Sequence, residues 1–102
     1  MAFAGNALAA CGGGQIVVRQ GEVLGKVELP IAGLISDSPA AVVARQAASV
    51  LEGLQAVGCT MNNANMQLSL LALVVIPEVR LSDLGMVDVT RFSFIPVAES
   101  EA

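Results

Sequence analysis

The chain has 102 residues, of which 55% are hydrophobic and 14% charged, and its formal net charge is −4. It has no histidine, tryptophan or tyrosine and two cysteines, which excludes a histidine-dependent nucleophile and the usual transition-metal sites, and its isolated basic residues form no nucleic-acid-binding stripe. Because soluble chains average about 25% charged residues, we expect the surplus apolar surface to be covered by a second copy or by a larger domain of the same parent protein.

The N-terminal third predicts a helix followed by a β-hairpin. Apolar residues recur at helical spacing over residues 1–11, and three glycines ending at Gly14 stop this helix. The glycines lack both the Lys-Ser/Thr of a P-loop and the spacing of a dinucleotide fingerprint, so we expect them to serve the backbone rather than to cradle a phosphate. Residues 15–29 alternate in polarity on either side of Gly21, which predicts two antiparallel strands joined by a turn at that glycine.

A joint between sheet and helix is predicted next. Pro30 ends the second strand, because proline cannot donate to the hydrogen-bond ladder. The stretch Ile31–Ile35, with Gly33 at its centre, predicts a short buried crossing. Ser36 or Asp37 then offers the side-chain oxygen that caps the N-terminus of a helix.

One long helix follows, over about residues 37–57. Its apolar residues recur every three or four positions, and polar residues occupy the opposite face, which predicts a helix with one buried side. Gly58 provides the left-handed conformation that commonly follows a last helical turn.

The C-terminal third predicts further strands. The apolar run Leu68–Ile76 fits a strand or a short helix, its length favours a strand, and it is far shorter than the roughly 20 residues that span a bilayer. Pro77 ends this run. Gly85 closes a turn in which Asp83 is expected to bond the backbone, and a last strand is predicted at about 88–97.

Together these elements predict an α+β fold with a single domain over residues 1–97. Its antiparallel sheet of about four strands comprises the hairpin 15–29 and strands near 68–76 and 88–97, packed by the long helix and the N-terminal helix. Residues 98–102 are expected to form a disordered tail.

The N-terminus lacks the cationic segment of a signal peptide, so we expect a cytoplasmic protein with reduced thiols and without a membrane or nucleic-acid partner.

Several blocks of this sequence resemble one known family. They include Gly-Gly-Gly-Gln-Ile-Val-Val at 12–18, Leu-Pro-Ile-Ala-Gly-Leu-Ile-Ser-Asp at 29–37, and the long apolar block that leads through Ile-Pro-Glu-Val-Arg-Leu-Ser-Asp-Leu-Gly at 76–85. From about residue 3 to 97 the chain is similar to the C-terminal domain of bacterial adenine deaminases. It departs from that family at 64–68, where Ala-Asn-Met-Gln-Leu stands in place of the frequent Pro-Phe-Met-Thr-Leu.

The resemblance implies a parent enzyme that converts adenine and water to hypoxanthine and ammonia. In that family an upstream amidohydrolase barrel carries the catalysis and holds a divalent metal, manganese or iron. The implied partners of this chain are therefore the barrel of its own parent chain and, in a homo-oligomer, further copies. No catalytic residue, cofactor or metal is expected within the 102 residues themselves.

Three residues are candidates for contact with the substrate or the barrel. Ser36 and Asp37 are either helix caps or part of a loop that faces the active site of the complete enzyme, and the two roles are compatible. Asp83 is either a turn residue or a substrate contact. Two other functions remain open: a stand-alone binding or oligomerisation module, and an enzyme that uses carboxylates such as Asp37 and Asp83 for acid–base chemistry.

Overall fold

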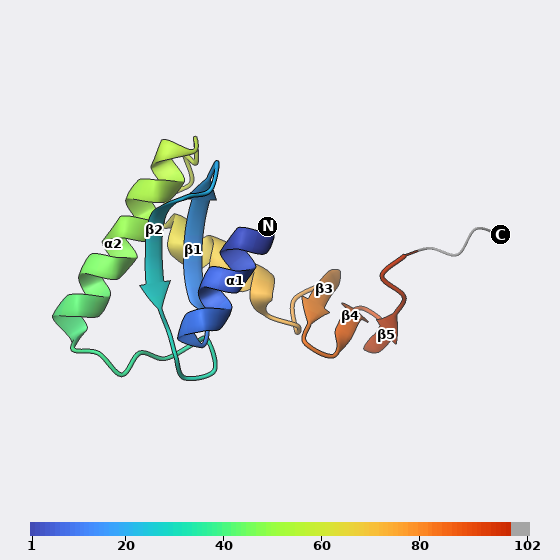
Figure 1. Ribbon diagram of the computed structural model, residues 1–102. Helices are drawn as coiled ribbons and strands as arrows, with labels where there is room; N and C mark the ends of the chain where they lie inside the picture. Colours follow the sequence, from blue (N-terminus) through green and yellow to red (C-terminus); the bar gives the residue numbers. More distant parts are fainter. Residues whose placement is uncertain (99–102) are drawn as a thin grey trace. The chain divides into compact units, whose positions relative to one another are not determined.

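A computed structural model describes residues 1–98 of the chain (Figure 1). Its helices and two antiparallel sheets confirm the α+β class. The chain divides into two compact units, Met1–Asn65 and the residues from Met66 onward, and each is described by itself. The elements are α1 (Ala2–Cys11), β1 (Gly14–Arg19), β2 (Glu22–Glu28), α2 (Ala40–Ala56), α3 (Ala64–Ser69), the 3₁₀ helix η1 (Leu70–Ala72), β3 (Val79–Ser82), β4 (Gly85–Asp88) and β5 (Ser93–Ile95).

The described part differs from the predicted single sheet. β1 and β2 form one two-stranded sheet, and β3, β4 and β5 form a separate three-stranded sheet. Most of the predicted tail, 98–102, lies outside the described residues. No helix within residues 1–98 has both the length and the apolar character needed to cross a membrane.

The predicted hairpin is confirmed as β1 and β2. Its register runs from Gly14 opposite Glu28 to Arg19 opposite Glu22, with an irregularity after Val17. The turn consists of Gln20 and Gly21 at φ values of 50° and 77°. Two positive φ values in a two-residue turn match the right-handed twist of the flanking strands, which is why a glycine is favoured there.

Glycines also end both long helices of the first unit, as predicted. Gly12 has φ 88° and donates its N–H to the Ala9 carbonyl, while the next N–H reaches back to the Leu8 carbonyl. At the end of α2, Gly58 has φ 97° and donates to Gln55, and the following N–H returns to Leu54. These paired bonds satisfy carbonyls that the last helical turn leaves free.

The core of the first unit lies between the hairpin and α2. Val17, Val27 and Val50 are its buried members, and partly buried apolar side chains pack around them: Leu24, Leu29, Val43 and Leu54. α2 runs alongside β2 (Figure 1). Gly25 makes this approach possible, because a Cβ there would fall against the Ser49 carbonyl of α2.

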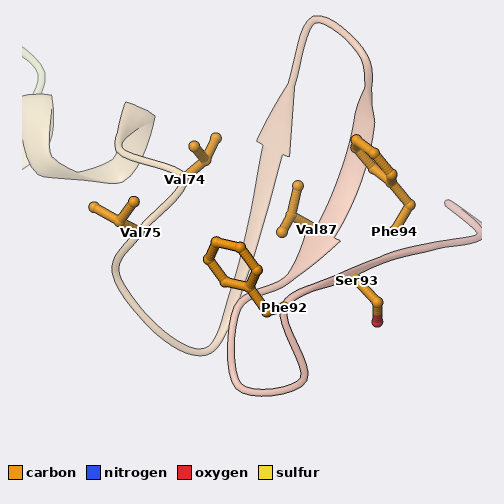
Figure 2. Close-up of a pocket in the computed structure, with 6 residues that line it drawn as sticks. All are labelled: Val74, Val75, Val87, Phe92, Ser93 and Phe94. Atoms are coloured by element: carbon orange, nitrogen blue, oxygen red, sulfur yellow. The ribbon is translucent and has the colours of Figure 1, made fainter.

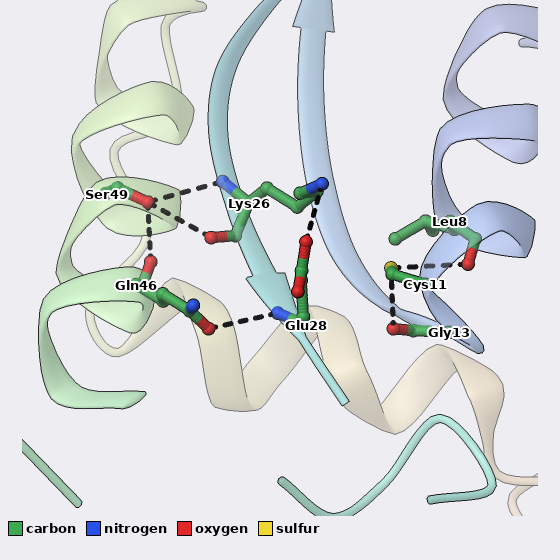
Figure 3. Close-up of polar contacts among 7 residues, drawn as sticks. All are labelled: Leu8, Cys11, Gly13, Lys26, Glu28, Gln46 and Ser49. Carbon is green, nitrogen blue, oxygen red and sulfur yellow. Dashed lines mark hydrogen bonds and ion pairs between the residues drawn. The ribbon is translucent and has the colours of Figure 1, made fainter. Parts of the chain in front are cut away.

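Side chains of α2 also cover the outer edge of β2 (Figure 3). The Lys26 N–H donates to Ser49 Oγ over 3.3 Å, and the Glu28 N–H donates to Gln46 Oε1 over 3.2 Å. The Ser49 hydroxyl in turn lies 2.6 Å from the Gln46 carbonyl oxygen. Unpaired strand edges invite pairing with other chains, so these two side chains close one edge of the hairpin.

Ser49→Ala is expected to lower the free energy of unfolding by about 0.5–1.5 kcal/mol. The change leaves the Lys26 N–H without its partner, which costs about 1–2 kcal/mol, and alanine recovers a few tenths of a kcal/mol of helix propensity. Urea unfolding followed by circular dichroism measures the difference, with Ser38→Ala, at an exposed position before α2, as the control. A Ser49→Ala chain as stable as the control would contradict this role.

The predicted N-terminal cap of the long helix is wrong. α2 begins at Ala40, Pro39 holds the N-cap position, and no side chain caps the helix. Ser36 Oγ instead accepts the Ser38 N–H over 3.1 Å and closes a short turn. The reason is Pro39, because the residue before a proline is pushed out of the helical region, so a helix cannot run through Ser38.

The predicted buried crossing at Ile31–Ile35 is also wrong, because the segment is an exposed turn. Ile31 and Ile35 form an isolated antiparallel bridge, and Ala32 and Gly33 reverse the chain at φ values of 58° and 72°. Ile31, Leu34 and Ile35 are 50%, 75% and 59% exposed. A reversal this tight leaves no room to bury all three apolar side chains.

The 31–35 turn also explains why Gly13 is a glycine. A Cβ built on Gly13 would sit 2.7 Å from the Cα of Gly33. A Cβ on Gly14, at φ 142°, would fall against the Val27 carbonyl oxygen. The glycine block at 12–14 therefore serves close backbone packing, as expected.

β2 ends at Glu28, two residues before Pro30.

In the second unit, the predicted strand at 68–76 is wrong. The run continues α3 to Ser69 and then forms η1. Leucine and alanine are good helix formers, and Ser69 Oγ bonds the Met66 carbonyl over 2.7 Å inside the helix. Only the end of the run, Val74–Ile76, is β-branched, and it forms an irregular segment before Pro77.

The predicted last strand at about 88–97 is confirmed only over the three residues of β5, Ser93–Ile95, and residues 89–92 form a turn. β4 ends at Asp88, and β5 begins at Ser93 and pairs with it antiparallel. Asp88 Oδ1 accepts the Arg91 N–H over 3.1 Å, which tightens the intervening turn. The turn between β3 and β4 is confirmed, with Gly85 at φ 141°.

Candidate functional site

The sequence-predicted candidates Ser36 and Asp37 lie together between the exposed 31–35 turn and α2. Ser36 is partly buried and its hydroxyl accepts the Ser38 N–H, while Asp37 is exposed. Within residues 1–98, no hydrogen bond or ion pair is found for the Asp37 carboxylate. Because Leu34 and Ile35 are exposed just before them, this stretch offers an apolar turn followed by a free carboxylate. Such a surface is suited to contact rather than to proton transfer.

Asp83 belongs to the second unit, so the structure describes no site common to all three candidates. Asp83 is exposed at the turn between β3 and β4. The side chain that closes this turn is Ser82: its Oγ donates to the Gly85 carbonyl over 2.8 Å and accepts the Leu84 N–H over 3.2 Å. Asp83 therefore does not make the expected bond to the backbone, because Ser82 makes the hydrogen bonds of this turn. The Asp83 carboxylate has no partner among the described residues.

The family resemblance implies a divalent metal in a parent enzyme, and the side chains of residues 1–98 do not fit it. Across the described residues, no three side chains of His, Cys, Asp or Glu gather closely enough to hold a metal ion. Cys11 and Cys59 are both free thiols. No reaction step through a metal is therefore assigned to residues 1–98.

A cavity of about 220 Å³ lies in the second unit (Figure 2). Its lining residues are Val74, Val75, Val87, Phe92, Ser93 and Phe94. Valine and phenylalanine side chains make up nearly all of this lining, and Ser93 contributes its only hydroxyl. Recognition of a purine needs placed donors and acceptors for its ring nitrogens, which this lining lacks, so the cavity suits an apolar group.

Sequence reasoning missed this cavity. The sequence predicted one strand at about 88–97, which did not reveal the turn that separates β4 from β5. Phe92 has φ 57° and is 82% exposed. A positive φ is uncommon for a bulky residue, and no sequence pattern announces it.

Polar contacts of the first unit gather on both sides of the hairpin (Figure 3). Lys26 Nζ lies 2.9 Å from Glu28 Oε1, two residues along the same strand face. The hydrogen bond and negative charge of Glu28 raise the pKa of Lys26 above its ordinary value, and partial desolvation opposes this rise. The Cys11 thiol lies 3.4 Å from the carbonyl oxygens of Leu8 and Gly13 at the end of α1.

The Lys26–Glu28 pair predicts a small loss of stability at alkaline pH. Because the folded-state pKa of Lys26 is raised, its contribution is fully present below the unfolded pKa of about 10.4 and is lost as pH rises through the folded value. Both side chains are partly exposed to solvent, so the loss is at most about 0.5 kcal/mol. Unfolding midpoints at pH 9 and pH 11.5 measure it, and Glu28→Gln is expected to remove this part of the pH dependence. An equal alkaline loss in both chains would contradict it.

Comparison with known proteins gives one family. Residues 1–93 match the family described as the adenine deaminase C-terminal domain. The chain is 63% identical over 99 residues to an adenine deaminase of Ruegeria sp. (strain TM1040), and 59% identical over 100 residues to that of Roseobacter denitrificans. A more distant relative, the adenine deaminase of Moorella thermoacetica, is 47% identical over 95 residues.

The matches cover nearly all of this chain but little of each relative. They span 97% of the chain and 16% of the Ruegeria sp. protein, and 98% of the chain and 17% of the Roseobacter protein. The chain thus corresponds to about one sixth of the length of these curated relatives. No solved structure matches it significantly.

Proposed function

The chain belongs to the adenine deaminase C-terminal domain family, and from this membership we propose that it acts as the non-catalytic C-terminal part of an adenine-deaminating hydrolase. The parent reaction would convert adenine and water to hypoxanthine and ammonia. In this proposal the chemistry and its divalent metal belong to the rest of the parent polypeptide. The domain supports that catalytic portion, contributes to the rim of its active site, or builds the oligomer.

The observation that carries the proposal is the match of residues 1–93 to the family, together with relatives named adenine deaminase that are about six times longer than this chain. The distribution of apolar side chains supports it. Within the described residues only four hydrophobic residues are buried, Val17, Val27, Val50 and Ala64, whereas many large apolar side chains are exposed. Contiguous exposed apolar surface typically marks an interaction site, so a domain that packs against a larger partner accounts for it.

The candidate contacts fit the same role. The exposed turn with Leu34 and Ile35, followed by the free carboxylate of Asp37, would meet the catalytic portion or the edge of its substrate site. Asp83 would do so from the second unit. A cytoplasmic location and a homo-oligomeric parent enzyme remain part of the proposal.

A chimeric enzyme tests the proposed function. The matching segment of the Ruegeria sp. adenine deaminase is replaced by this chain, and ammonia release from adenine is measured for the chimera, for the 102-residue chain alone with manganese or iron, and for the enzyme with the segment deleted. We expect activity in the chimera, none above blank in the chain alone, and loss of soluble active enzyme on deletion.

Two results would contradict the proposal. Ammonia release by the 102-residue chain alone would make it an enzyme in its own right, dependent on carboxylates such as Asp37 and Asp83. An inactive, misfolded chimera beside a fully active deletion variant would favour the alternative function, a stand-alone binding or oligomerisation module that serves no catalytic barrel.

A further inference from the structure

We propose that the second unit docks on the catalytic portion of the same polypeptide through one apolar face, and that this portion inserts an apolar side chain into the cavity of the second unit. The face consists of Val74, Val75, Val87, Phe92 and Phe94, and we call it the valine–phenylalanine face (Figure 2). The inference rests on the proposed function and names the surface through which it operates.

The second unit has no core of its own among its described residues. From Met66 to Ala98 no side chain is buried. Its strands contain only four, four and three residues. Val75, Phe92 and Phe94 are 65%, 82% and 63% exposed. A small sheet needs a covered hydrophobic face to be stable, so this sheet needs a covering surface from outside residues 66–98.

Phe92 gives the second observation. Its φ of 57° places a bulky aromatic residue in the left-handed region, which costs roughly 1–2 kcal/mol relative to the right-handed helical region and which glycine or asparagine occupies more readily. The ring is nevertheless 82% exposed and lines the cavity (Figure 2). Local folding therefore does not account for an aromatic residue here, whereas burial of the ring against another surface does.

The catalytic portion of the same chain is the occupant that the observations favour. The relatives extend far beyond the matched segment, which covers only 16–17% of their length. A covalently linked partner has a high effective concentration, so five side chains suffice to hold it. A second copy would need a larger surface, because stable interfaces use about 20–30 residues a side.

The cavity defines the chemistry of the contact. At about 220 Å³, with valine and phenylalanine side chains forming most of its wall, it has room for one or two apolar side chains. The cavity does not suit a charged group, since burying a charge without an ion-pair or hydrogen-bond partner is costly. A leucine, isoleucine, methionine or phenylalanine of the catalytic portion is the expected occupant.

The test compares Phe92→Asn with Leu84→Asn, both in the chimeric Ruegeria sp. enzyme and in the 102-residue chain. Leu84 is a matched control, because it is 80% exposed, lies at a turn of the same unit and does not line the cavity. In the 102-residue chain, we expect neither change to lower the unfolding midpoint, since asparagine tolerates the left-handed region. In the chimera, we expect Phe92→Asn to lower the melting temperature by several degrees and to speed hydrogen exchange of β4 and β5 at least tenfold, while Leu84→Asn does neither.

The outcomes separate this inference from the proposed function. If the unsubstituted chimera deaminates adenine but Phe92→Asn behaves like Leu84→Asn, the docking face is wrong and the proposed function stands. If the unsubstituted chimera is inactive while the deletion variant is fully active, the proposed function itself fails. If the 102-residue chain forms a dimer that Phe92→Asn dissociates, the face joins two copies and the inference is overturned.

If Phe92→Asn also unfolds the 102-residue chain, the test uses Val75→Asn instead. Val75 lies in an irregular segment of the same face, and the expected results are the same.

Discussion

Gly25→Ala is expected to lower the free energy of unfolding of the first unit by about 3 kcal/mol or more. Gly25 is buried where β2 packs closely against α2, and an added methyl group would fall against the carbonyl of Ser49 and lie 2.8 Å from the Cα of Val50. These are backbone atoms, so no side chain can rotate away. Overpacking of this kind costs about 1–3 kcal/mol, and moving α2 outward would also break the Ser49 and Gln46 bonds to the edge of β2.

Gly5→Ala is the matched control, because a methyl group on Gly5 meets nothing within 4 Å in α1. Alanine in a helix interior is favoured over glycine by about 1 kcal/mol, so this variant is expected to be as stable as the parent chain or more stable. Urea denaturation of both variants, followed by circular dichroism at 222 nm to report helix content, compares them. A Gly25→Ala chain with an unchanged midpoint would show that α2 does not approach β2 as described.

Val50→Ala is expected to lower the free energy of unfolding by about 2–3 kcal/mol. Val50 is 3% exposed and packs with Val17 and Val27 in the buried apolar cluster of the first unit. Removing two methyl groups from such a position loses their transfer free energy and leaves a cavity. Because the first unit has so few buried side chains, this loss is a large fraction of its stability.

Leu51→Ala provides the comparison for Val50. Leu51 follows Val50 on α2 but is 37% exposed, so its truncation is expected to cost less than about 1 kcal/mol. Thermal and urea unfolding midpoints of the two variants measure the difference. Equal losses at both positions would mean that α2 is rotated about its axis relative to the described packing.

Elements that depend on local chemistry were predictable from the sequence. The turn at Gly21, the helix end at Gly58 and the turn at Gly85 all have positive φ values, and glycine adopts these without steric cost. The long helix was predictable because its apolar residues recur at helical spacing, which matches the buried side of α2. The alternation of residues 15–29 likewise indicated the hairpin.

Other elements were set by effects that the pattern does not contain. The apolar run at 68–76 fits a strand by length, but its leucines and alanine prefer a helix, and helix propensity prevailed up to Ala72. The start of the long helix was misplaced, because Pro39 excludes Ser38 from helical geometry. Ile31–Ile35 was assumed to be buried because it is apolar, whereas its exposed side chains are consistent with a surface that another part of a larger protein covers.

Of the candidate functional residues, too, the sequence predicted some and missed others. Ser36, Asp37 and Asp83 were chosen because polar residues carry recognition chemistry, and the structure leaves the two carboxylates exposed and without partners among the described residues. The valine–phenylalanine face was not predicted, because it depends on the turn between β4 and β5 and on the positive φ of Phe92. A linear sequence pattern does not encode either feature.

Hydrogen exchange measures whether a larger polypeptide completes this chain. Amide exchange of β3, β4 and β5 is measured in the 102-residue chain and in the same residues of the chimeric Ruegeria sp. enzyme. We expect fast exchange in the 102-residue chain and protection increased at least a hundredfold in the chimera, because the exposed apolar face becomes covered. Equal protection in the two proteins would contradict it, since the second unit would then be stable without a partner.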